Sequence, residues 1–303
     1  MSRVLNFFKA YQHLDAEETS IILGELEELY ASYQIFPKTN LAQLNSENYP
    51  KISNLIHQMS EKSRVKTEGG RQYVENMNAR THAQYTKLIA ILKAFERDTL
   101  RRIFNQHSSI NLKELQFVVF DLSKMQGLPQ EALNALLFNV LTIMWQEVYR
   151  NRFINQDVLK DAEKRKYIIC VIDEAHRFFK SEQEGTMDFI SLMVRQARKN
   201  SAALWMASQS ARDFYPTVSS NRGKFVDQMQ SIFALVPYKV LMKQDQSDVR
   251  YLQELLPSFT DNEIASTLSF DRGQMLIEVA GEGKIIVNRF IHPEYLELFG
   301  GGR

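Results

Sequence analysis

An unbroken apolar run followed by two carboxylates constrains the fold of this chain more than any other feature. Residues 168–172 read Ile-Ile-Cys-Val-Ile, and Asp173 and Glu174 follow directly. A short apolar run predicts a strand buried on both faces, as in a parallel sheet. In open parallel sheets, ligands bind outside the carboxyl ends of the strands. Asp173 and Glu174 are therefore candidates to hold a cation and polarise a water; the alternative is a solvated or ion-paired acidic pair.

Composition limits the class of protein without naming an activity. The chain has 303 residues, 44% of them hydrophobic, and a formal net charge of +1, which argues neither for nor against nucleic acid. Its single cysteine, Cys170, lies in the apolar run and favours a core role. The absence of a possible disulfide and of a signal peptide predicts a cytoplasmic chain. No apolar run approaches the ~18 residues of a membrane span, and the histidines have no metal-ligand spacing.

Residues 1–112 are predicted to form an all-helical subdomain. Asp15 followed by Glu18 predicts a capping box at the start of a helix. The polar stretch 60–71, which contains two adjacent glycines, is predicted to be a loop. Apolar residues keep helical spacing in three stretches, 22–33, 52–59 and 85–104. A packed helical core without catalytic groups is expected here.

Residues 113–303 are predicted to form an α/β core. A second apolar run, 115–123, predicts a strand that ends near an acid, and an amphipathic helix over 133–148 follows it. A strand, a helix and then the central strand follow one another at the spacing of a crossover connection. This order predicts that the strands 115–123 and 168–172 are parallel and joined by a right-handed connection. Near the C-terminus, 274–280 and 284–290 flank a glycine turn and predict a β-hairpin.

A basic helix and a third strand follow the two carboxylates. The strand predicted over 203–208 ends on Gln209, which should lie at the same edge as Asp173 and Glu174. There Gln209 can orient a water or sense a γ-phosphate; the alternative is an ordinary polar residue at a strand end. The preceding helix carries Arg195 and Arg198. They could reach a nucleotide held by a neighbouring subunit, and the alternative is a solvated basic face.

The order of these motifs resembles the conjugative type IV secretion ATPases of the TrbE/TraC kind, which belong to the HerA and FtsK group of RecA-like motor ATPases. The resemblance is carried by the segments FVVFDLS, YIICVIDEAHRFF, RQARKNSAALWMASQSARDF and RGQMLIEVAGEGKIIVNRF, in that order. It implies an incomplete RecA-like parallel sheet with flanking helices over residues 113–303. It also implies that residues 1–112 correspond to a helical insertion within such a core. A helicase of the DEAH type is a third, weaker interpretation, since no other helicase motif accompanies those four letters.

The resemblance also implies roles for the candidate residues. Asp173 corresponds to the Walker B acid that holds Mg²⁺, Glu174 to the catalytic base and Gln209 to the polar sensor. Arg195 and Arg198 match the basic helix in which an arginine finger is expected. The implied partners are secretion-channel components, a coupling ATPase and, as a further candidate, DNA. The full-length form is expected to be a homo-oligomeric ring or dimer, in the cytoplasm or peripheral at the inner face of the cell membrane.

One departure from this family pattern is serious. The phosphate-binding signature G-x-x-x-x-G-K-[ST] does not occur in the sequence. The segment Gly281-Glu282-Gly283-Lys284 has too short a glycine spacing, and Ile285 stands where Ser or Thr is required. Because the P-loop amides and lysine form the main cradle for phosphate, ATP and Mg²⁺ are expected to bind only if a P-loop is supplied from elsewhere.

The sequence thus resembles the C-terminal portion of a secretion ATPase and is expected to be inactive alone. The alternative is a non-catalytic assembly or interaction module of the same machinery. The P-loop strand is central in RecA-like sheets, so its absence should leave a sheet edge and apolar surface exposed.

Overall fold

The computed structural model describes residues 2–298 apart from 40–43, 69–70, 76, 108–114, 126, 158–164, 180–183 and 216–221. The chain forms two compact units, Met1–Ile143 and Met144–Arg303. Helix α6, Gln130–Asp157, belongs to both, because the division falls within it. This division does not test the predicted boundary between a helical subdomain, 1–112, and an ATPase core, 113–303. That boundary stays a prediction.

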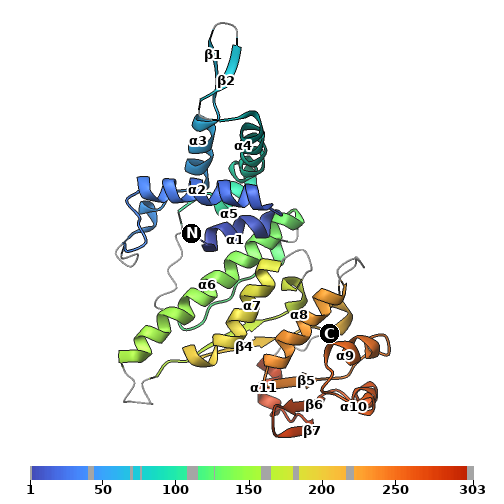
Figure 1. Ribbon diagram of the computed structural model, residues 1–303. Helices are drawn as coiled ribbons and strands as arrows, with labels where there is room; N and C mark the ends of the chain where they lie inside the picture. The colour runs from blue at the N-terminus through green and yellow to red at the C-terminus, as the bar shows by residue number, and fades with distance from the viewer. Residues whose placement is uncertain are drawn as a thin grey trace. The chain divides into compact units, whose positions relative to one another are not determined.

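The first unit is built from short helices around a closed core. Figure 1 shows α3 and α4 side by side, with the hairpin β1–β2 beyond their ends. The capping box predicted from Asp15 and Glu18 is present, and the backbone N–H of Glu18 donates to Asp15 Oδ1 at 2.8 Å. The elements are α1 (Ser2–Tyr11), α2 (Ala16–Ser32), η2 (Ser46–Asn48), α3 (Ile52–Lys62), β1 (Val65–Glu68), β2 (Arg71–Val74), α4 (Ala79–Leu92), η3 (Lys93–Glu96), α5 (Asp98–Phe104) and η4 (Ser123–Met125).

An aromatic cluster forms part of this core. Phe95, at 0% exposure, packs its ring against four others: Phe7, Phe8, Tyr11 and Phe104. Met59, also at 0% exposure, belongs to the same core. Because the apolar stripes of the helices meet one another, this unit buries its core with its own residues.

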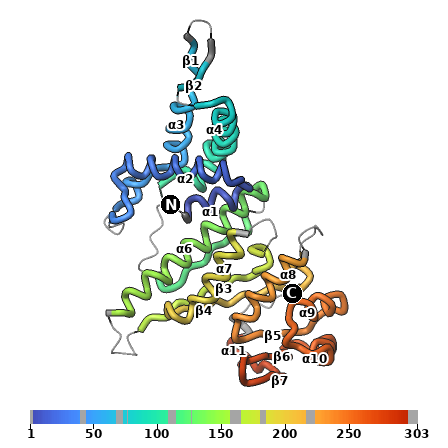
Figure 2. The backbone as a smooth tube through the Cα atoms, in the orientation of Figure 1, coloured from blue at the N-terminus to red at the C-terminus, as the bar shows by residue number. Residues whose placement is uncertain are grey.

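Two predictions for the first unit are wrong in detail. The predicted loop 60–71 holds the end of α3 and strand β1, which pairs antiparallel with β2 from Val65↔Val74 to Glu68↔Arg71 (Figure 2). The unit is therefore not all-helical. The predicted strand 115–123 is not a strand, because its described residues pair with no other described strand. Phe117 and Val119 are 84% and 70% exposed. An apolar run forms a strand only where a partner can bond its backbone, and no described strand does so here.

The second unit contains two sheets. β3 and β4 pair in parallel from Ile168↔Ala202 to Ile172↔Met206. β5, β6 and β7 form an antiparallel sheet in that order, which confirms the predicted C-terminal hairpin. The elements are β3 (Ile168–Ile172), η6 (Ala175–Phe178), α7 (Glu184–Gln196), η7 (Arg198–Asn200), β4 (Ala202–Met206), η8 (Ala211–Phe214), α8 (Arg222–Leu235), β5 (Tyr238–Leu241), α9 (Val249–Leu255), α10 (Asp261–Ser266), η10 (Thr267–Ser269), β6 (Gln274–Val279), β7 (Gly283–Asn288) and α11 (Pro293–Leu298).

The two faces of the β3–β4 pair differ sharply. Cys170 and Ile172 are 6% and 5% exposed, whereas Val171 on the opposite face is 63% exposed. Trp205, which stands opposite Val171 in the register, is 62% exposed. The prediction that this strand is buried on both faces is therefore wrong, since one face lacks a cover among the described residues. The predicted exposure of apolar surface is confirmed. We call Ile169, Val171 and Trp205 the open face of this sheet.

Two helices of the second unit, α7 and α8, pack against each other (Figure 1). In the part of the chain that the structure describes, no helix has the length and apolar character needed to cross a membrane.

Candidate functional site

The parallel register brings the predicted carboxylates and amide to one edge of the sheet. Beyond the last paired residues, the backbone N–H of Ala207 donates to the Ile172 carbonyl at 2.9 Å, and the N–H of Ala175 donates to the Ala207 carbonyl at 2.8 Å. These bonds hold the ends of both strands together, so that Glu174 and Gln209 can meet although they are 35 residues apart in sequence.

Both carboxylate oxygens of Glu174 have a partner. Gln209 Nε2 donates to Oε1 at 2.5 Å, and His176 Nδ1 lies 3.2 Å from Oε2. The Glu174 backbone has a left-handed conformation, with φ 50° and ψ 46°, and its N–H donates to Asp173 Oδ1 at 2.9 Å. A non-glycine residue in this conformation costs on the order of 1 kcal/mol. The chain holds a strained residue where the candidate base stands.

His176 is a residue of this site that sequence reasoning missed. Its Nδ1 also lies 3.1 Å from Ser208 Oγ, and its ring meets Phe214 edge-on, with 6.5 Å between ring centroids. The signal was available in part, since His176 follows Glu174 by two residues and Ser208 immediately precedes Gln209 beyond the end of β4. His176 is held between the two strand ends, where Nδ1–H can donate either to Ser208 or to Glu174.

Asp173 has the exposure and chemistry that a magnesium ligand needs. Its side chain is exposed, and of its two oxygens Oδ1 accepts the Glu174 N–H. Magnesium usually takes one or two protein carboxylates and completes its coordination with water and substrate phosphates. In the described residues, no group of three or more His, Cys, Asp and Glu side chains could form a complete metal cage. The donor set fits an ion that is shared with a phosphate ligand.

The two predicted arginines lie at the opposite end of the parallel pair. Arg195 is in the last turn of α7 and Arg198 begins η7, directly before β4. The N–H of Ile168, the first residue of β3, donates to the Ser201 carbonyl at 3.1 Å, so this turn adjoins the start of the strands. A strand of 5 residues separates the two edges, a span of about 15 Å at ~3.3 Å per residue. Both arginines are exposed, and the structure does not bring them to Glu174 of the same chain.

Comparison with known proteins identifies the family. Residues 67–284 match the TraG P-loop domain family, which is more than half of the chain. This chain belongs to the TraG P-loop domain family. All five predicted site residues, Asp173, Glu174, Arg195, Arg198 and Gln209, lie within the matched range. The predicted kinship with the type IV secretion ATPases is confirmed at this level, while the individual roles of the five residues stay predictions.

The fold of this TraG P-loop chain is shared with a solved structure. VirB4 of Thermoanaerobacter pseudethanolicus is similar over 98% of this chain and 70% of its own, with a TM-score of 0.78 and 20% sequence identity. The predicted α/β class is confirmed by this likeness. An uncharacterized protein of Bacillus anthracis is 27% identical over 207 residues, which are 66% of this chain and 32% of that protein. The chain thus spans about a third of the length of this curated relative.

Proposed function

We propose that this chain is the Walker B and sensor portion of a type IV secretion motor ATPase, which hydrolyses ATP to power DNA or protein transfer and channel assembly. One observation carries the proposal: in a TraG P-loop chain, Glu174 and Gln209 are hydrogen-bonded at the carboxyl edge of a parallel pair, beside the exposed Asp173. This is the edge at which α/β sheets bind their ligands.

The residues of this edge have distinct tasks in the proposal. Asp173 holds Mg²⁺, which when bound offsets charge on the phosphate oxygens. Glu174 accepts a proton from the attacking water, and Gln209 orients that water. Gln209 and His176 each contact one oxygen of Glu174, and 26% of the side chain stays exposed, so each carboxylate oxygen keeps a lone pair that a water can reach.

The phosphate cradle comes, in this proposal, from a P-loop outside the present sequence. Two observations support it. The signature is absent from the sequence, and the open face of the β3–β4 sheet presents apolar side chains that a further polypeptide segment can cover. In the described residues, β4 pairs only with β3, and β5 only with β6. Each strand therefore has an edge that can accept another strand.

Phosphate release tests this function directly. The purified chain should hydrolyse no ATP above buffer. Addition of a polypeptide that carries the P-loop portion of a TraG P-loop ATPase should produce turnover. Glu174→Gln should abolish that turnover by removing the base, whereas Glu282→Gln, on the exposed turn of the hairpin, should not. Turnover by the chain alone that disappears with Glu174→Gln would contradict the need for a supplied P-loop.

The same proposal assigns Arg195 or Arg198 to a neighbouring subunit's site. Its support is their exposure and their distance from Glu174 within one chain, together with the fixed charge of a guanidinium that can grip phosphate in two places. A finger in trans can raise the rate ~10³-fold or more. In the reconstituted, oligomeric ATPase, Arg195→Ala or Arg198→Ala should abolish hydrolysis while ATP still binds; Lys199→Ala is the control. Mixing such subunits with Asp173→Ala subunits should restore turnover, and co-assembly without rescue would refute the trans assignment.

Partners and location belong to the same proposal. The motor would act as a ring or dimer on secretion-channel components and a coupling ATPase, with DNA as a candidate cargo. It would work in the cytoplasm or at the inner face of the membrane, where ATP is supplied.

The open apolar face also supports a second candidate, a non-catalytic assembly module. Pull-down of channel components by the Asp173→Ala, Glu174→Gln double variant, independent of nucleotide, would favour that candidate.

A further inference from the structure

A buried carboxylate outside the candidate site holds the segment that carries Gln209. Asp248 is 5% exposed and lies directly before α9. Its Oδ1 accepts a hydrogen bond from Ser210 Oγ at 2.6 Å and another from the Arg212 backbone N–H at 3.1 Å. Ser210 is the residue after Gln209, so one oxygen fixes the segment at two points beside the predicted sensor.

The same segment is docked on α9 at a second place. The rings of Tyr215 and Tyr251 pack with 4.6 Å between centroids, and Tyr215 Oη donates to the Tyr251 carbonyl at 3.3 Å. The Asp248 carbonyl in turn accepts the N–H groups of Tyr251 and Leu252, each at 3.0 Å. Asp248 is thus held by the first turn of α9 and is not free to follow the segment.

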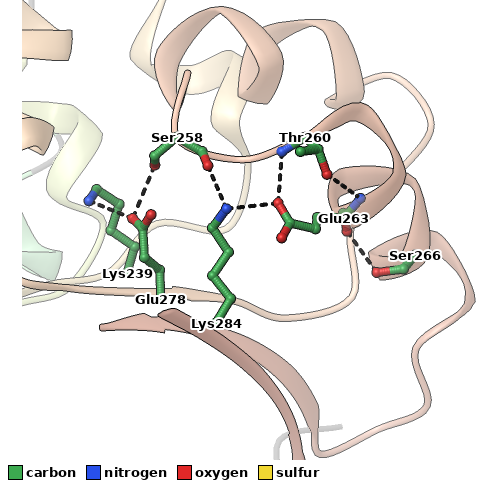
Figure 3. A network of polar contacts seen from close by, with 7 residues as sticks. All are labelled: Lys239, Ser258, Thr260, Glu263, Ser266, Glu278 and Lys284. Carbon is green, nitrogen blue, oxygen red and sulfur yellow. Dashed lines mark hydrogen bonds and ion pairs between the residues drawn. The ribbon is translucent and has the colours of Figure 1, made fainter. Parts of the chain in front are cut away.

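Polar contacts fix the surroundings of α9 to the antiparallel sheet (Figure 3). We call α9, α10 and strands β5–β7 the C-terminal module. Lys284 Nζ from β7 donates to the Ser258 carbonyl, between α9 and α10, and to Glu263 Oε2 of α10 at 2.8 Å. Ser258 Oγ donates to Glu278 Oε2 of β6 at 3.1 Å, and Lys239 Nζ of β5 reaches the same oxygen at 2.7 Å. The module therefore gives Asp248 a firm support.

The other end of the held segment touches the candidate base. Ser208 Oγ lies 3.1 Å from His176 Nδ1, and Gln209 Nε2 donates to Glu174 Oε1. A side-chain contact is no longer a hydrogen bond once donor and acceptor are about 3.6 Å apart or the angle falls to about 100°. A small shift of the segment would therefore change the Gln209 contact with Glu174 and the Ser208 contact with His176, whose ring is the second side-chain partner of that carboxylate.

We propose that Asp248 is a positioning residue: through Ser210 and Arg212 it sets the places of Ser208 and Gln209, and thereby the orientation of Glu174. Its catalytic meaning rests on the proposed function, but the positioning itself does not. The C-terminal module is then the support on which the sensor segment is aligned, and a movement of the module reaches the carboxylate through Asp248.

Nuclear magnetic resonance of the nucleotide-free full chain tests the positioning. The signals are the side-chain amide of Gln209 and the imidazole nitrogens of His176, each assigned from a variant that lacks it. Asp248→Ala should shift both sets of signals and speed amide exchange at Arg212 about fivefold, because the N–H loses one of its two acceptors and keeps Ser210 Oγ at 3.2 Å. Asp248→Asn keeps an acceptor oxygen and should restore the wild-type signals. A purely stabilising role would lower the melting temperature without moving the Gln209 and His176 signals.

The control is Asp245→Ala. Asp245 is an exposed carboxylate in the same loop whose Oδ1 accepts the Ser247 N–H at 2.9 Å, and its removal should leave the Gln209 and His176 signals in place. If Asp248→Ala does not fold, Ser210→Ala removes one of the two bonds from the other side. Unchanged Gln209 and His176 signals in a folded Asp248→Ala, or in Ser210→Ala, overturn the proposal. Since no nucleotide is present, failure of the ATPase assignment is recognised separately, by absent phosphate release in the reconstituted enzyme.

Discussion

The helical core of the first unit and the parallel strand pair of the second use apolar residues in opposite ways. Met59 and Phe95 are fully buried among neighbours from the same unit, whereas Val171 and Trp205 are more than half exposed. Soluble proteins rarely leave a contiguous apolar face uncovered unless it binds something. The difference teaches that the first unit closes its own core, while the strand pair presents a surface suited to a further polypeptide.

Two glutamates show the same contrast in polar chemistry. Glu25, at 2% exposure, accepts from Tyr85 Oη at 2.6 Å, from Lys62 Nζ at 2.7 Å and from Gln58 Nε2 at 2.6 Å. Glu174 has an amide and an imidazole as side-chain partners and keeps 26% of its side chain exposed. A carboxylate saturated by donors is structural, and one that solvent can reach is available for proton transfer.

The largest expected effect comes from breaking the closed core. Phe95→Ala should lower the free energy of unfolding by about 3–5 kcal/mol, because it leaves a cavity where four aromatic rings meet. Both tryptophans, Trp145 and Trp205, belong to the second unit. The midpoint of urea unfolding should therefore shift more when circular dichroism is the probe than when tryptophan fluorescence is. Equal shifts of both probes would show that the units unfold as one.

The two faces of β3 can be compared by thiol chemistry. Burial raises the pKa of Cys170 to about 11 from an ordinary 9.0, which alone lowers the thiolate fraction about a hundredfold. Reaction of native Cys170 with an aromatic disulfide near neutral pH should be at least ~100-fold slower than that of Val171→Cys in a Cys170→Ser background. Comparable rates would mean that the open face is covered or that the buried face opens readily.

The hydrogen bonds around the buried Glu25 predict a smaller effect on stability, and one that depends on pH. Burial first, and then the hydrogen bond to Glu25, raise the pKa of Tyr85 above its ordinary value of 10.0. A raised folded-state pKa contributes stability that is present below the unfolded value and lost as pH rises above it. Tyr85→Phe should cost about 1–2 kcal/mol near pH 8. The difference in the free energy of unfolding between wild type and Tyr85→Phe should narrow above about pH 10, as measured by urea unfolding. A gap that stays constant with pH would exclude this tyrosine as the source.

The smallest effect is expected on the open face. Trp205→Ala should change the stability of the isolated chain by less than about 0.5 kcal/mol, since most of the side chain is already in water. If the face receives a P-loop-bearing segment, the same variant should weaken binding of that segment in a calorimetric titration. A strongly destabilised isolated chain would show instead that the face is covered within it.

The sequence by itself determined the features whose cause is local. The apolar run of β3, the glycine turn between β6 and β7, and the capping box at Asp15 all follow from neighbouring residues, and each is present. Parallel-strand logic also placed Gln209 at the edge of Asp173 and Glu174, because polar residues at the ends of adjacent parallel strands must meet.

Only the tertiary structure decided which strands have partners and which groups hold the site. The run 115–123 has the composition of a strand, yet strand formation depends on a distant backbone that a local pattern does not specify. The contacts of Glu174 with Gln209, of His176 with Ser208 and of Asp248 with Ser210 join residues 35, 32 and 38 positions apart. Closing such loops requires the packed sheet and α9 first, so the sequence predicted the candidate carboxylate while the fold selected the residues that contact it.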